Sequence, residues 1–72
     1  MDLLTRLITR TTSKSYIIGT HYILQRCRDG WEIISIEGDC LFWSPPLEPA
    51  AEYFIEQETE QVVEALLGIK NE

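Results

Sequence analysis

Residues 31–43 read Trp-Glu-Ile-Ile-Ser-Ile-Glu-Gly-Asp-Cys-Leu-Phe-Trp, and this stretch decides the fold. Two runs rich in β-branched and aromatic residues flank Gly38 and Asp39, and glycine tolerates the positive φ of a tight primed turn. The pattern predicts a β-hairpin with a two-residue loop, which fixes the register. The predicted pairs are Glu37 with Cys40, Ile36 with Leu41, Ser35 with Phe42, Ile34 with Trp43 and Ile33 with Ser44.

Both faces of the predicted hairpin are apolar. One face carries Ile34, Ile36, Leu41 and Trp43, and the other carries Trp31, Ile33, Cys40 and Phe42. A sheet with one face in water would alternate apolar and polar side chains more cleanly. We therefore expect both faces to be covered by other parts of the protein or by a partner.

A helix is predicted after the hairpin, over about residues 49–67. Pro49 suits the first helical position, and Gly68 lies where a C-terminal cap is expected. The apolar stripe of this helix contains Leu47, Ala51, Phe54, Ile55, Val62, Ala65, Leu66 and Ile69. Glu58 falls near its centre, where a buried lone carboxylate is costly. We expect either a helix break near Thr59, with Thr59 capping a second segment, or a basic partner for Glu58.

The N-terminal half is harder to assign. Asp2 and the spacing of apolar residues favour a short helix over 3–10, although the β-branched residues there also permit a strand. Residues 11–15 are polar and are expected to form a connector, and residues 16–18 are typical of a short strand. Residues 20–28 fit a helix slightly better than a strand, because Gly30 suits the position that closes a helix.

The length of 72 residues and the mass of 8.3 kDa predict one domain over residues 1–72. The fold class is therefore α+β, with a small antiparallel sheet built on the 31–43 hairpin and the C-terminal helix packed on it. A chain this short has a marginal core, so a partner surface would stabilise it.

The charge of the chain opposes binding to nucleic acid or to an anionic membrane, because the formal net charge is −6. Residues 1–28 carry five basic and one acidic residue, whereas residues 29–72 carry eleven acidic residues and one lysine. In one interpretation the basic part packs beside the acidic helix and the two fields partly cancel. In the other, an exposed acidic helix binds a basic partner or imitates a phosphate backbone.

The sequence contains no motif of a catalytic or metal site. His21, Cys27 and Cys40 supply only three soft ligands, whereas a structural zinc site needs four. No export signal or membrane span is recognisable, and the two cysteines are expected to be small buried residues of a cytoplasmic chain. We predict no enzymatic activity, no metal and no cofactor.

The favoured function is a non-catalytic protein–protein interaction module, a homodimeric accessory or regulatory protein. One alternative is an acidic DNA mimic that inhibits a nucleic-acid enzyme, and another is a small-ligand binder or enzyme subunit with an intersubunit pocket. The partner is expected to be a protein or a second copy, without direct contact to nucleic acid or membrane. The predicted interface residues are Trp31, Ile33 and Phe42 on the hairpin and Tyr53, Val63 and Leu67 on the helix.

Overall fold

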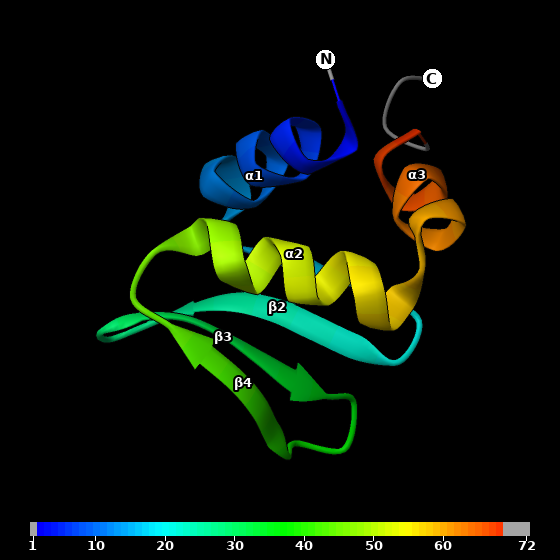
Figure 1. Ribbon diagram of the computed structural model, residues 1–72. Coiled ribbons are helices and arrows are strands. Elements are labelled where there is room, and N and C mark those ends of the chain that lie inside the picture. The colour runs from blue at the N-terminus through cyan, green and yellow to red at the C-terminus, as the bar shows by residue number, and fades with distance from the viewer. Residues whose placement is uncertain (1, 69–72) are drawn as a thin grey trace.

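The computed structural model describes residues 2–68, which form a four-stranded antiparallel sheet and three helices. The elements are α1 (Leu3–Lys14), β1 (Tyr16–Ile18), β2 (Tyr22–Cys27), β3 (Gly30–Ser35), β4 (Cys40–Ser44), α2 (Leu47–Glu58) and α3 (Glu60–Gly68). The strands lie in chain order, and the helices gather on one side of the sheet (Figure 1). The predicted α+β class, with the C-terminal helix packed on a sheet built around the hairpin, is confirmed.

The hairpin loop is one residue longer than predicted. The Ser35 N–H donates to the Asp39 carbonyl at 2.8 Å, and the Gly38 N–H donates to the Ser35 carbonyl at 2.8 Å. These bonds enclose a three-residue loop over residues 36–38, a common hairpin connection that places glycine at its last position. Gly38 has a φ of 107°, so its expected positive φ is confirmed although the two-residue loop is wrong.

A β-bulge changes the register further along the hairpin. Ile34 pairs with Cys40 and Ile33 with Phe42, so Leu41 is the extra residue. The predicted partners of Ile33 and Ile34 are therefore wrong. The longer loop and the bulge together still leave Ile33 and Phe42 on one face, but they move Cys40 to the other.

Residues 22–27 form strand β2, where a helix over 20–28 was favoured. β2 lies between β1 and β3, and Leu24 pairs with Ile17 on one side and with Ile33 on the other. Gly30 does not close a helix. It begins β3, where a Cβ would collide with the Ser44 carbonyl. Long-range pairing on both sides of β2 thus outweighs a weak local preference.

The N-terminal helix is confirmed, but it continues through the predicted connector to Lys14. The Asp2 carboxylate caps it by accepting the Thr5 N–H at 2.8 Å. Thr11 is buried because it extends the apolar face, and its hydroxyl donates to the Leu7 carbonyl one turn earlier at 2.7 Å. A polar residue with its hydrogen bond satisfied inside the helix does not end it.

The C-terminal helical region breaks at Thr59, which is one of the two outcomes expected from the sequence. Thr59 has a φ of 82°, and its hydroxyl accepts the Val62 N–H at 3.3 Å at the start of α3. The break resets the helical phase. Val63 and Leu67 are therefore buried, whereas Ala65, which a continuous helix would turn inward, is exposed.

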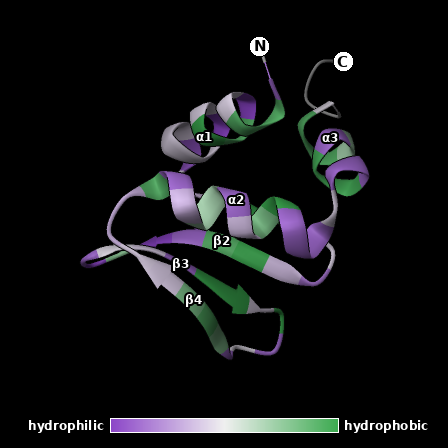
Figure 2. Ribbon diagram, viewed as in Figure 1, coloured by the Kyte–Doolittle hydropathy of each residue, from purple (hydrophilic) through white to green (hydrophobic). Residues whose placement is uncertain are grey.

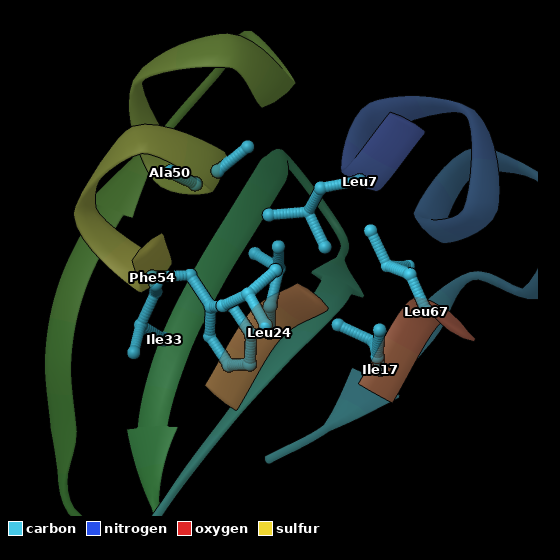
Figure 3. Close-up of a cluster of buried hydrophobic side chains, with 9 residues drawn as sticks. Leu7, Ile17, Leu24, Ile33, Ala50, Phe54 and Leu67 are labelled. Carbon is cyan, nitrogen blue, oxygen red and sulfur yellow. The ribbon is translucent and has the colours of Figure 1, made fainter. Parts of the chain in front are cut away.

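The core lies between the sheet and the helices. Figure 3 shows side chains from all of these layers pointing toward one another: Leu7, Ile17, Leu24, Ile33, Ala50, Phe54 and Leu67. Every helix and the strands β1 to β3 contribute at least one fully or nearly fully buried apolar residue. The apolar sides of all three helices are therefore buried over the same face of the sheet.

Candidate functional site

The face of the sheet toward the helices, called the inner face below, is closed. Its central row crosses all four strands through the pairs Ile17 with Leu24, Leu24 with Ile33, and Ile33 with Phe42. Leu24 and Ile33 are fully buried and Ile17 is nearly so. Helix α2 packs on β2, β3 and β4, and α1 packs on β1.

The six predicted interface residues lie on this inner face or on the helices that cover it. The Phe42 and Tyr53 rings stack on each other, with centroids 4.6 Å apart and an interplanar angle of 9°. Ile33 and Val63 are fully buried and Leu67 is 3% exposed. The hairpin and helix surfaces expected to meet a partner thus contact each other, and Trp31, Phe42 and Tyr53 remain partly exposed.

The opposite side of the sheet, called the outer face, carries a second apolar row. The pairs Ile18 with Ile23, Ile23 with Ile34, and Ile34 with Cys40 place these side chains next to one another across all four strands. Ile18 is 53% exposed, and Cys40 is exposed rather than buried as expected. Figure 2 shows hydrophobic segments in β2, β3 and β4, consistent with apolar residues at consecutive positions.

The neighbouring row of the outer face is mixed in polarity. It runs from Tyr16 through Gln25 and Glu32 to Trp43, and the two aromatic residues at its ends are 50% and 48% exposed. The Gln25 amide donates to the Glu32 carboxylate at 2.6 Å. Within residues 2–68, no element covers this face, although its apolar character at Ile34 and Trp43 led us to expect a cover.

Glu58 is the one buried carboxylate that the structure describes, at 3% exposure. Burial by itself raises its pKa, but three hydrogen bonds outweigh this effect and the pKa is lowered. The donors are the Thr20 hydroxyl at 2.6 Å, the His21 N–H at 2.8 Å and the Tyr22 N–H at 2.7 Å. Gly19 leaves room for the carboxylate, since a Cβ there would collide with it.

These contacts make Glu58 an anchor between the end of α2 and the β1–β2 loop rather than a reactive group. The sequence signalled the conflict at Glu58 but not its solution. Its partners are backbone amides and a hydroxyl more than 35 positions away in the chain, and no residue pattern reveals them.

Two shallow hollows lie at the ends of the sheet. One, of about 400 Å³, is lined by Thr20, His21, Tyr22, Ser35, Ile36 and Glu37. The other, of about 210 Å³, lies beside β1 and is lined by Arg10, Lys14, Tyr16, Ile17 and Ile18. In the part of the chain that the structure describes, no three His, Cys, Asp or Glu side chains form a group that could hold a metal ion, so His21, Cys27 and Cys40 are not brought together.

The chain matches no model of a protein family, and neither a curated protein nor a solved structure is similar enough to count as a match. Among residues 2–68, no helix has both the length and the apolar character needed to cross a membrane. The geometry defines a two-layer α+β domain with an open outer sheet face, and its function has to be argued from its surfaces.

Proposed function

We propose that this chain is a non-catalytic protein–protein interaction module that forms a homodimer through its outer sheet face and acts as an accessory or regulatory protein. The observation that carries the proposal is the exposure of Tyr16, Ile18 and Trp43 on the face that none of the helices within residues 2–68 covers. Ile36 and Leu41, at the hairpin end, are exposed as well. Large apolar side chains gathered on one face mark an interaction site more often than single scattered ones do.

The outer face is complementary to itself, which favours a second copy as the partner. A twofold axis that runs along the strands, midway between β2 and β3, lays β2 of one copy over β3 of the other. Ile23 of one copy then faces Ile34 of the other, and Gln25 faces Glu32, because these residues are paired neighbours in the sheet. In such an isologous contact each carboxylate meets an amide instead of a like charge.

Two facing sheets of this kind form a sandwich whose side chains interdigitate. The contact would turn the open two-layer domain into a four-layer dimer, with helices on both outsides. This arrangement provides the additional buried apolar surface that a domain of 72 residues lacks.

Sedimentation equilibrium at micromolar concentrations tests the proposal with matched variants. We expect the parent chain to approach twice its mass of 8.3 kDa, and the variants Trp43→Glu and Ile18→Glu to remain near 8.3 kDa. Ala65→Glu introduces the same charge at an exposed position of α3 and should leave the dimer intact. Circular dichroism checks that each variant folds.

Two results would contradict this assignment. A parent chain that stays near 8.3 kDa at every concentration removes the homodimer. A dimer that survives both outer-face substitutions places the interface elsewhere on the chain.

The proposal also places the chain in the cytoplasm, since Cys27 and Cys40 are both free thiols and Cys40 is exposed. Such thiols remain reduced in that compartment. Fractionation of the native host with an antibody against the chain would test this part of the proposal.

One further observation favours an acidic mimic of DNA as the second candidate. Carboxylates recur at every fourth position along α2 and α3, and the exposed members of this series are Glu48, Glu52, Glu56, Glu60 and Glu64. The basic helix α1 packs against α2 and α3 and weakens the negative electrostatic potential of these carboxylates, which counts against this candidate. Affinity for a DNA-binding enzyme that falls steeply as salt rises would favour this candidate, whereas a contact through the outer face should be far less sensitive to salt.

A further inference from the structure

We propose that the free edge of β1 binds an extended peptide whose side chains alternate between acidic and apolar, so that the peptide adds to the sheet as a fifth strand. This second site uses the edge of the sheet and does not depend on self-association through the outer face. The β1 edge below means the side of Tyr16–Ile18 that faces away from β2.

The register leaves backbone groups of β1 free to pair. The Arg26 N–H donates to the Ser15 carbonyl at 2.9 Å, and the Gly19 N–H donates to the Tyr22 carbonyl at 2.8 Å. In an antiparallel ladder, bonding toward one neighbour alternates from residue to residue. The N–H and C=O groups of Tyr16 and Ile18 therefore point away from β2, toward the space where a further strand would lie.

Positive charge stands beside this edge. Arg10 and Lys14 of α1 line the same hollow as Tyr16, Ile17 and Ile18. Lys14 is exposed, and the Arg10 guanidinium donates to the Leu67 carbonyl at 3.3 Å, which holds it near the end of α3. Because α1 lies on the helix side of the sheet (Figure 1), Arg10 and Lys14 would flank an added strand on its inner side.

The two sides of the added strand would meet different chemistry. Successive side chains of a strand point to opposite faces. Those on the inner side would reach Arg10 and Lys14, which favours carboxylates. Those on the outer side would extend the surface of Tyr16 and Ile18, which favours apolar groups. The site therefore selects alternation of acidic and apolar residues, and not acidity alone.

The other edge of the sheet is protected against the same mode of binding. β4 contains the bulge at Leu41, Pro45 directly follows the strand, and the exposed acidic residues Glu37 and Asp39 precede it. Bulges, prolines and charges are devices that keep edge strands from pairing. β1 has none of these on its own three residues, and its surroundings are basic rather than acidic.

A second copy of this chain is a poor occupant of the β1 edge. Antiparallel pairing of β1 with β1 about a twofold axis would put both α1 helices on the same side of a continuous sheet. Lys14 and Arg10 of one copy would then approach Lys14 and Arg10 of the other, and like charges repel. Charge complementarity instead points to an acidic partner segment.

The probe is the capped, fluorescently labelled peptide acetyl-Glu-Val-Glu-Val-Glu-Val-amide, with binding measured by fluorescence anisotropy. We expect saturable binding that Lys14→Glu weakens by about tenfold, whereas Arg28→Glu, the same charge change on an exposed turn, alters it less than about twofold. The peptide with Lys in place of Glu should not bind. Amide shifts in NMR spectra should be largest at Tyr16 and Ile18.

N-methylation of the peptide separates strand addition from simple charge attraction. One version carries methyl groups on the three Glu nitrogens and another on the three Val nitrogens. Only one set of N–H groups faces β1, so one version should bind and the other should lose binding. Equal affinity of both versions, an unchanged affinity of Lys14→Glu, or no binding by the parent peptide would overturn the proposal.

The measurement is repeated on the Trp43→Glu chain, in which the proposed homodimer is absent. Binding that persists there shows that the edge site operates on the monomer. The homodimer is tested by the mass of the chain in solution, and the edge site is tested by peptide binding. Failure of one proposal can therefore be told apart from failure of the other.

Discussion

Ile33 and Ile34 are the same residue type at consecutive positions of β3, yet they belong to different parts of the molecule. Ile33 lies on the inner face, is fully buried and packs in the core with Phe54. Ile34 lies on the outer face, in a row that runs from the exposed Ile18 to the exposed Cys40. The difference teaches that apolar character alone does not determine burial in this chain.

What decides burial is the number of helices and the side on which they lie. All three helices pack on the inner face or behind it (Figure 1), and the apolar side of each helix is buried there. The chain has no fourth helix among residues 2–68 to place on the outer face. Within residues 2–68, the apolar outer face therefore stays uncovered.

The largest expected effect compares the two isoleucines directly. Ile33→Ala should lower the free energy of unfolding by about 2 to 5 kcal/mol, because it leaves a cavity in the core. Ile34→Ala should cost less than about 1.5 kcal/mol, because its side chain is only partly buried. Urea unfolding at a concentration at which the chain is monomeric gives both values.

If Ile33→Ala does not fold, Ile33→Val provides the comparison, with an expected loss of about 0.5 to 1.5 kcal/mol. Ile34→Val is its matched control and should be close to neutral. Equal losses for the two positions would mean that both faces of the sheet are covered in the monomer.

The next effect concerns the anchor that fixes the helices over the inner face. Glu58→Gln should destabilise the chain by about 1 to 3 kcal/mol at neutral pH, because neutral hydrogen bonds replace charge-assisted ones and the amide nitrogen takes the place of the oxygen that accepts from the Thr20 hydroxyl. Glu56→Gln removes an exposed carboxylate from the same helix and should change stability by less than about 0.5 kcal/mol. Thermal or urea unfolding measures both.

The same anchor makes stability depend on pH. The hydrogen bonds lower the pKa of Glu58 in the folded state, so its stabilising contribution is complete above the ordinary pKa of a glutamate. It is lost as the pH falls through the lower pKa of the folded state. The difference in free energy of unfolding between the parent chain and Glu58→Gln should therefore become smaller in acid. A difference that grows as the pH falls would contradict this account.

The smallest expected effect concerns the turn that joins β3, the strand carrying Ile33 and Ile34, to β4. Gly38→Ala should cost about 1 kcal/mol, because its φ of 107° is strained for any residue with a Cβ even though the space around it is open. Gly68→Ala also meets open space but has no positive φ, so it should be neutral or slightly stabilising. Equal stability of the two variants would show that the backbone of Gly38 is not strained.

Several features of the fold could be predicted because their causes are local. Asp2 caps a helix through a contact three residues away, and Gly38 adopts the positive φ that its turn requires. The break at Thr59 was one of the two outcomes expected from a carboxylate in the middle of an apolar stripe. In each case a few neighbouring residues contain the whole physical reason.

The predictions that were wrong concern features whose structure depends on residues far away in the chain. Residues 22–27 form a strand because β1 and β3 pair with them on both sides, and the phase of α3 is reset by a single backbone angle at Thr59. The same limit applies to the predicted interface residues. Phe42 and Tyr53 were each recognised as contact residues, but the sequence could not show that they stack on each other.

The sequence by itself determined the apolar character of both hairpin faces, the turn at Gly38 and the end of a helix near Thr59, because period, turn chemistry and burial cost act over a few residues. Only the tertiary structure decided which face the helices cover, how Glu58 is satisfied and which sheet edge stays open. These outcomes depend on packing between elements tens of residues apart. Their free energies are fixed by the whole arrangement and not by any local segment.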